Sequence, residues 1–149
     1  MTQARSRIVP PADRGYAPDA EDLAALDAWF RRYDAYAAAG DVAGTADMAL
    51  FPLNTVTDDS SGEGSARQLD REEYLRVMGG ALGDPGDLTM NSTRTPYLLT
   101  PGLAVVFTEA EFTVDGRSQR VRYADVLVRT GGEWRFQTMV QGGWGDQAA

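Results

Sequence analysis

Proton transfer by this chain has to rest on carboxyl and phenol groups. The 149 residues include no His and no Cys, and all 14 basic residues are Arg. Histidine bases, cysteine nucleophiles, thiolate metal sites and Schiff-base lysines are therefore excluded. At neutral pH, the groups left to move a proton are Asp, Glu, Tyr, water and the α-amine. The composition thus restricts proton transfer to these few groups.

Asp125 is the carboxyl whose neighbours in the sequence most favour such chemistry. It lies in a stretch typical of a β-strand, where alternation places it on one face with Val121, Tyr123 and Leu127. A carboxylate on so apolar a face is poorly solvated, so its pKa is expected to rise. The alternative is a structural salt bridge to one of three arginines, Arg94, Arg122 or Arg129.

Three helices are predicted in the first half of the chain. Asp19 offers an N-cap to the first helix, Gly40 ends it, and Asp41 caps a second, shorter helix that runs toward Leu50 and stops at Pro52. One apolar stripe at helical spacing marks the first helix: Leu23, Leu26, Trp29, Phe30, Tyr33 and Ala37. Residues 70–73 have the spacing of a capping box and open the third helix, which ends at residues 79–80.

The second half of the chain is predicted to be β. A short strand at residues 53–57 and a polar loop at 58–64 precede the third helix, and a turn at 84–87 follows it. Four strands rich in Val, Phe, Tyr and Thr then occupy residues 88–100, 103–114, 119–130 and 134–144. Their short connections require neighbouring strands to run antiparallel. Because these strands exceed the usual length, bulges and strong curvature are expected.

This element order predicts an α+β fold in which three helices pack on one face of a strongly curved, mostly antiparallel sheet. Residues 1–18 hold three prolines and no periodicity, so they are expected to form a flexible tail. Residues 19–146 form the single expected domain.

The order helix, helix, strand, helix and four strands resembles the cone fold of the nuclear-transport-factor-2-like (NTF2-like) superfamily, which includes SnoaL-type polyketide cyclases and ketosteroid isomerases. Three local segments carry the resemblance: residues 36–41 at the end of the first helix, Leu50-Phe51 with residues 56–59, and residues 122–136 in the last hairpin. The fold hosts dehydratases, isomerases, epoxide hydrolases, cyclases and binding modules, so it decides no activity.

The resemblance implies a set of catalytic residues. Tyr33 matches the position of the oxyanion-hole tyrosine of ketosteroid isomerases, Asp58 or Asp59 the general base, and Asp125 the second oxyanion donor. Five residues are expected to bind substrate: Trp29, Arg94, Tyr123, Gln141 and Trp144. The plainer alternatives are a core tyrosine at Tyr33 and turn-closing aspartates at Asp58 and Asp59.

Two functions follow from the resemblance. The first is a cofactor-independent enzyme of isomerase or cyclase type, which acts on an apolar substrate bearing a carbonyl or an epoxide. In the isomerase version, a carboxylate removes a proton beside the carbonyl and two donors hold the enolate oxygen. In the cyclase version, one carboxyl protonates the opening ring and another accepts a proton from the attacking hydroxyl. The second function is a non-catalytic ligand-binding or dimerisation module.

Charge and hydropathy limit the partners. The net charge is −8, and an acidic chain without a basic run is a poor match for nucleic acid. No apolar run approaches the length of a membrane span, and the N-terminus lacks a secretory pattern, so a cytoplasmic location is expected. The expected partners are a small apolar ligand and a second copy bound through the sheet, with neither a metal nor a cofactor.

Overall fold

The computed structural model of the chain describes residues 15–82 and 89–146. It contains three α-helices, α1 (Ala20–Ala38), α2 (Val42–Ala46) and α3 (Arg71–Leu82). The strands are β1 (Ala49–Asp58), β2 (Gly64–Leu69), β3 (Thr89–Thr100), β4 (Leu103–Val114), β5 (Arg117–Thr130) and β6 (Glu133–Gln141), and a 3-10 turn, η1 (Trp144–Asp146), follows. Most of the predicted tail and the predicted turn at residues 84–87 lie outside the described residues.

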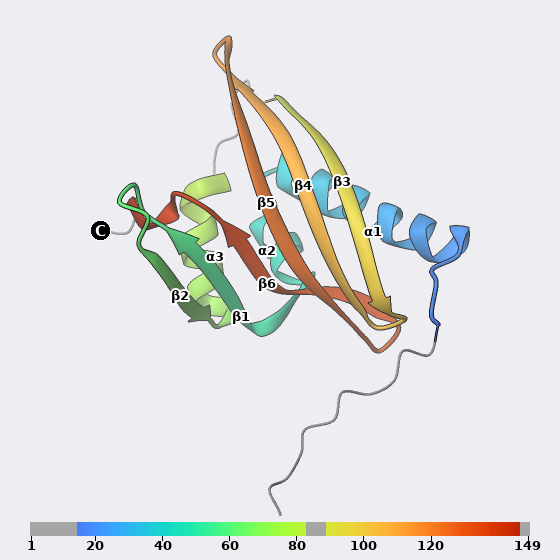
Figure 1. Cartoon of the computed structure of the whole chain (residues 1–149). Coiled ribbons are helices and arrows are strands. Elements are labelled where there is room, and N and C mark those ends of the chain that lie inside the picture. The colour runs from blue at the N-terminus through green and yellow to red at the C-terminus, as the bar shows by residue number, and fades with distance from the viewer. Residues whose placement is uncertain (1–14, 83–88, 147–149) are drawn as a thin grey trace, which may run out of the picture.

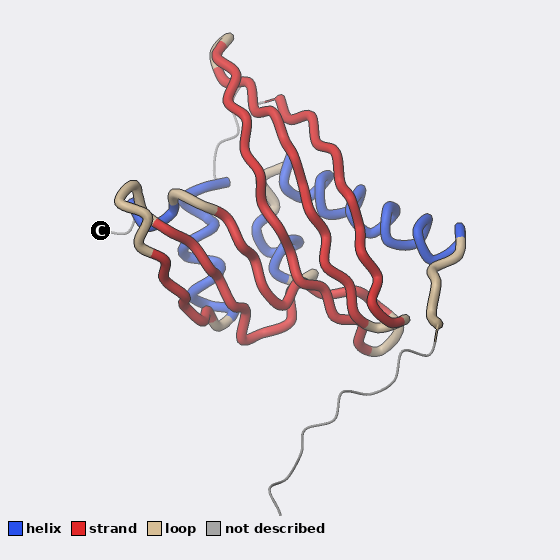
Figure 2. The backbone as a smooth tube through the Cα atoms, viewed as in Figure 1, coloured by secondary structure: helices blue, strands red, loops and turns tan. Residues whose placement is uncertain are grey.

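The strands form one curved, open sheet in the order β2-β1-β6-β5-β4-β3, with the helices on one side of it (Figures 1 and 2). The β3–β4, β4–β5 and β5–β6 pairs are antiparallel, as the short turns require. The β1–β6 pair is parallel and contains a register shift. The predicted α+β class and mostly antiparallel curved sheet are confirmed.

Local sequence explains where the helices begin. The Asp19 carboxylate accepts a hydrogen bond from Asp22 N (2.8 Å), and the Asp22 carboxylate accepts one from Asp19 N (3.2 Å), which closes a capping box on α1. Asp41 caps α2 through Gly44 N (2.9 Å), and Asp70 caps α3 through Glu73 N (2.8 Å). Each cap satisfies a backbone donor that the first helical turn leaves free.

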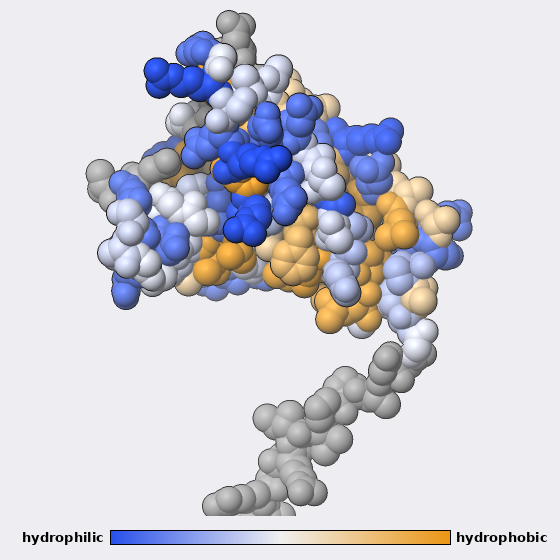
Figure 3. All heavy atoms as spheres, turned by 45° about the horizontal axis from the view of Figure 1, so that its top comes forward, coloured by the Kyte–Doolittle hydropathy of each residue, from blue (hydrophilic) through white to orange (hydrophobic). Residues whose placement is uncertain are grey.

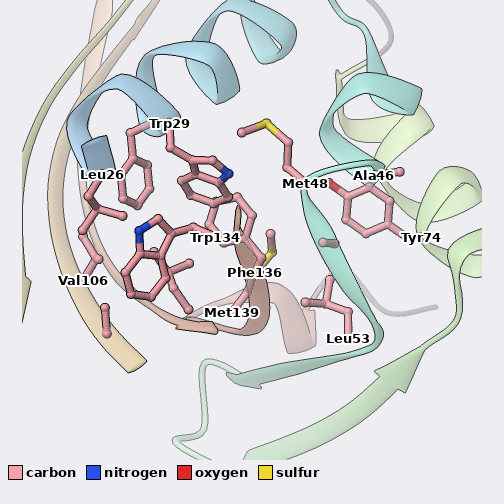
Figure 4. Packing of buried hydrophobic residues seen from close by; sticks show 14 of the residues in the cluster. Leu26, Trp29, Ala46, Met48, Leu53, Tyr74, Val106, Trp134, Phe136 and Met139 are labelled. Atoms are coloured by element: carbon pink, nitrogen blue, oxygen red, sulfur yellow. The ribbon is translucent and has the colours of Figure 1, made fainter. Parts of the chain in front are cut away.

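The inner face of the sheet and the first helix enclose an apolar core (Figure 4). Phe136 of β6 is its centre: its ring lies 4.6 Å from Trp29, 4.8 Å from Tyr33 and 6.0 Å from Phe30, between ring centroids. The contacts of Tyr33 and Phe30 are edge-on and that of Trp29 is tilted, and aromatic pairs of this kind add stability beyond the area that they bury. The core therefore fixes the distance between α1 and the sheet, and with it the position of every side chain between them.

Three element boundaries differ from the prediction. The second helix stops at Ala46, and residues 49–58 join the sheet, because Phe136 N donates to Met48 O (2.9 Å) and Ala49 pairs with Phe136. Residues 64–69, predicted as no element, form the edge strand β2 with five of six residues exposed. The last strand ends at Gln141 rather than at residue 144, since Gly143 turns the chain at φ 89°.

Candidate functional site

A cavity of about 550 Å³ lies between α1 and the inner face of the sheet. Helix α1, four strands and η1 all contribute to its wall. Half of the residues that line it are aromatic or carry a thioether: Phe30, Tyr33, Met90, Phe112, Tyr123, Phe136, Met139 and Trp144. A few polar groups converge within it, namely Asp34, Ser92, Arg94, Asp125 and Gln141. A mostly apolar cavity with a few placed polar groups is typical of a small-molecule site.

Asp125 is the carboxyl in this cavity that has no ion-pair partner among the described residues. It lies on β5 opposite Met139 of β6 and is only 5% exposed. Burial raises the pKa of Asp125 from its usual 3.8 to about 7, although the charge of Arg94 acts in the opposite direction. The side chain is therefore close to half ionised at neutral pH, so it is able both to accept and to donate a proton.

Two phenols share the cavity with Asp125. Tyr33 projects from α1, and burial raises its pKa, with the neighbouring Tyr74 and Asp125 adding to the rise. Burial also raises the pKa of Tyr123, which lies two residues before Asp125 on the same face of β5, while Arg94 opposes that rise. Both hydroxyls keep their protons at neutral pH, so each is a hydrogen-bond donor.

Arg94 is fixed on the cavity wall by Asp34. The guanidinium Nη1 and Nη2 atoms each donate to one carboxylate oxygen of Asp34, both at 2.7 Å. The guanidinium carbon also lies 4.3 Å from the centroid of the Phe30 ring. A bidentate pair that stacks on an aromatic ring holds arginine far more rigidly than a single contact. Asp34 carried no signal in the sequence, because its partner lies 60 positions away.

Gln141 and Trp144 complete the cavity at the end of β6. Trp144 N donates to Thr57 Oγ1 (3.0 Å), and Gly143 N donates to Asp58 Oδ1 (2.9 Å). Asp58, at the end of β1, thus holds the turn that carries Trp144. Of the residues predicted to bind substrate, Arg94, Tyr123, Gln141 and Trp144 lie in the lining, together with Tyr33 and Asp125.

Three predicted site residues lie outside the lining. Asp58 is occupied by Gly143, and Asp59 closes its own turn by accepting from Ser61 N (2.9 Å) and Glu63 N (3.1 Å). The hydrogen bond from the Ser61 hydroxyl and those from the backbone lower the pKa of Asp59. Trp29 is a core residue against Phe136 and borders a different surface pocket. The structure does not support a base at Asp58 or Asp59, because these carboxylates stabilise loops.

Several lining residues were not predicted, and their signal in the sequence is weak. Met90 and Phe112 are ordinary apolar strand residues that become wall positions because β3 and β4 extend beyond the core. Thr108 lies on β4 between Arg94 of β3 and Tyr123 of β5 in the register, and its buried hydroxyl has no hydrogen-bond partner within the described ranges. Thr108 is not itself in the lining, but it places a buried hydroxyl between two residues that are.

Across residues 15–82 and 89–146, no three Asp or Glu side chains gather closely enough to hold a metal ion. None of the helices in that part of the chain is long and apolar enough to cross a membrane.

The raised pKa of Asp125 predicts how stability depends on pH. The folded protein binds this proton more tightly than the unfolded chain, so the contribution of Asp125 to stability is greatest below about pH 4 and falls as pH rises to about 7. The loss is about 4 kcal/mol at most. Urea unfolding of the wild type and Asp125→Asn at several pH values checks this, because Asn does not titrate. As pH rises, the free energy of unfolding of Asp125→Asn should increase relative to that of the wild type. A difference that stays constant with pH contradicts the burial argument.

Comparison with known proteins identifies the fold. No family model matches the sequence, and no curated protein is significantly similar to it. An NTF2-like protein of unknown function from Shewanella oneidensis matches with a TM-score of 0.62 and 12% identity, over 82% of this chain and 97% of that one. A protein proposed to be an NTF2-like dehydratase, from Streptomyces avermitilis, has a TM-score of 0.65 and 15% identity, over 83% and 96%.

A third solved structure comes from Xanthomonas campestris and is named as a proposed calcium/calmodulin-dependent protein kinase II association domain. It matches with a TM-score of 0.56 and 22% identity, over 91% of this chain and 97% of that one. This chain therefore has the NTF2-like fold, as the order of its elements indicated. At these identities the comparisons define the fold and leave the activity to the residues in the cavity.

Proposed function

We propose that this protein is a cofactor-independent acid–base enzyme that acts on an uncharged, mostly apolar carbonyl compound. The observation that carries the proposal is Asp125, a buried carboxyl without an ion-pair partner in the described chain, inside an apolar cavity that also holds two protonated phenols. A perturbed carboxyl in a cleft is a general indicator of a reactive site.

The reaction is a proton transfer beside the carbonyl. The ionised Asp125 carboxylate removes a proton from the carbon, the electron pair moves into the new C=C bond, and the carbonyl oxygen becomes an enolate. The hydroxyls of Tyr33 and Tyr123 donate hydrogen bonds to that oxygen, where negative charge develops. Where the substrate carries a C=C bond beside the deprotonated carbon, the electron pair extends to the far carbon of that bond. Protonated Asp125 then returns the proton to this far carbon, the C=O bond re-forms and the C=C bond shifts into conjugation with it, which completes an isomerisation without a cofactor.

The charges in the cavity favour an uncharged substrate. Nη1 and Nη2 of Arg94 each donate to Asp34, so the end of the guanidinium that would bind a ligand carboxylate through two parallel hydrogen bonds is already occupied, while the buried Nε has no hydrogen-bond partner within the described residues. Together, Asp34 and Arg94 carry no net charge, and ionised Asp125 repels an anion. We therefore expect ligands that develop negative charge only during the reaction.

An epoxide substrate has weaker support. Opening the ring with two carboxyls needs a second carboxyl in the cavity, and the other one in the lining is Asp34, which is held by Arg94. Dehydration of a hydroxy ketone uses the same first step as isomerisation, and one similar structure bears the name of a proposed dehydratase. The proposal therefore covers isomerisation and dehydration beside a carbonyl.

Titration with a fluorescent naphthol tests this site. A naphthol resembles an enol, and transfer of its proton to Asp125 gives a naphtholate held by Tyr33, which mimics the state after proton removal. At neutral pH we expect bound naphthol to show partial naphtholate emission. Tyr33→Phe should weaken binding about tenfold, since a hydrogen bond to a charged oxygen is lost. Asp125→Asn should abolish the naphtholate emission.

Tyr97→Phe is the matched control, because this tyrosine is 66% exposed on the far face of the sheet. It should leave both affinity and emission unchanged. Naphthol that does not bind, or that binds equally well to the Tyr33→Phe and Asp125→Asn proteins, would contradict the proposed site.

We also propose that the outer face of the sheet binds a second copy of the chain. Large apolar side chains are exposed there: Tyr97 (66%), Leu99 (62%), Phe107 (54%) and Leu103 (46%). The register places them close together, since Phe107 pairs with Thr95, two residues before Tyr97, and Leu103 pairs with Thr100, the residue after Leu99. Figure 3 shows hydrophobic residues gathered over the lower part of the molecule, below a hydrophilic upper part. A contiguous exposed apolar patch of this kind is typical of an interface.

A further inference from the structure

The Asp34–Arg94 pair has a geometry that bears on Asp125. Asp34 lies on α1 and Arg94 on β3, and the two side chains meet through parallel 2.7 Å hydrogen bonds at the edge of the cavity. The side chain of Arg94 is 15% exposed and that of Asp34 is 34% exposed, so the pair is partly shielded from water. Both residues line the cavity that contains Asp125.

Arg94 would be the natural ion-pair partner of Asp125 if it were free. It lies opposite Thr108 of β4, which in turn lies opposite Tyr123 of β5, two residues from Asp125 on the same inner face. Its charge already acts on Asp125 and Tyr123. A long, flexible guanidinium that lines the same cavity would turn toward this buried carboxylate, because such a pair is worth far more in an apolar cavity than in water.

We propose that Asp34 is a positioning residue that holds the Arg94 guanidinium against Phe30 and away from Asp125, which leaves Asp125 as an unpaired carboxyl facing the cavity. This extends the proposed function, in which Asp125 is the proton carrier. The groups that face Asp125 come from four elements: Tyr33 on α1, Tyr74 on α3, Arg94 on β3 and Tyr123 on β5. Arg94 is the cation among them.

The test is a direct titration of Asp125 in the full chain by carbon NMR of ¹³C-labelled aspartate, with the signal assigned by its loss in Asp125→Asn. In Asp34→Asn, Arg94 is released toward Asp125, and the midpoint of the titration should fall by about one to three pH units. Asp34→Glu keeps the charge and should retain most of the wild-type midpoint. Asp27→Asn is the matched control, because Asp27 forms an exposed ion pair with Arg31 on the same helix.

A double variant shows whether Asp34 acts through Arg94. Arg94→Gln should raise the midpoint, and Asp34→Asn added to Arg94→Gln should no longer lower it. If Asp34→Asn leaves the midpoint unchanged, or lowers it equally in the Arg94→Gln background, the proposal is wrong. If Asp34→Asn does not fold, the Asp34→Glu and Arg94→Gln proteins still test the proposal. A fall of the Asp125 midpoint in Arg94→Gln would overturn the proposal. A shifted titration in a protein without activity would support Asp34 as the positioning residue and reject the proposed reaction.

Discussion

Replacing Asp125 by Asn should slow proton exchange beside a bound carbonyl by about 10²–10⁴-fold. A bicyclic ketone such as 2-tetralone, dissolved in heavy water, is a suitable substrate, because its enol has the shape of the naphthol used for titration. Loss of the carbon-bound protons followed by proton NMR reports the rate. Asn has almost the same shape as Asp and is unable to take the proton, so the loss isolates the proton-accepting role of the carboxylate.

The pH dependence of this exchange follows from the same residue. As a base, Asp125 must be ionised, so kcat/KM of the wild type should rise with pH and level off above its pKa of about 7. The remaining exchange in Asp125→Asn should not show this rise with pH. A carboxyl in ordinary solvent would instead give a profile that is flat from mildly acidic to neutral pH.

Stability separates catalysis from folding in this experiment. Since ionised Asp125 is poorly solvated, the Asn variant should melt within a few degrees of the wild type at neutral pH or above it. Equal losses of stability and exchange would show that Asp125 serves the fold rather than the reaction. Asp59→Asn is the control, because it removes a carboxyl from a loop outside the lining and should leave exchange intact. Gln141→Glu is not suitable, since it adds a carboxyl to the cavity.

The parts of this structure that could be predicted are those that depend on neighbours in the sequence. Capping residues at Asp19, Asp41 and Asp70 mark where helices begin because the hydrogen bonds span three residues. The turn at residues 115–116 has positive φ at both positions, as a two-residue hairpin requires, and joins β4 to β5. The burial of Asp125 likewise follows from strict alternation along one strand.

The parts that could not be predicted depend on contacts between distant segments. Strand β2 is almost entirely exposed, so it has no hydrophobic alternation, and its pairing with β1 supplies its structure. Asp58 was one of the two aspartates that the resemblance implied as the base, yet its partner Gly143 lies 85 positions away and occupies it. Asp34 looks like a solvated helix residue until β3 brings Arg94 against it. In each case tertiary packing decided the role of a polar residue.

The second large effect is expected at the outer face of the sheet. If two copies pair there, Phe107→Arg places two cations within each dimer interface. Phe107 is 54% exposed in the single chain and pairs in register with Thr95 and Ala124, so the large side chain stands over small neighbours. A buried, unpaired arginine is costly, and the dissociation constant should rise by about 100-fold or more.

Sedimentation velocity over the micromolar range measures this effect. The wild type should sediment as a dimer and Phe107→Arg as a monomer, while the naphthol cavity on the opposite face keeps its affinity. Val77→Arg is the matched control for charge: Val77 is 41% exposed on α3, so the same added cation falls outside the sheet. A wild-type monomer at these concentrations, or a Phe107→Arg protein that remains dimeric, would reject the sheet as the interface. The cavity is formed within one chain, so naphthol binding does not require the dimer. If Phe107→Arg loses the dimer and still binds naphthol, assembly and ligand recognition are independent properties of the two sides of the sheet.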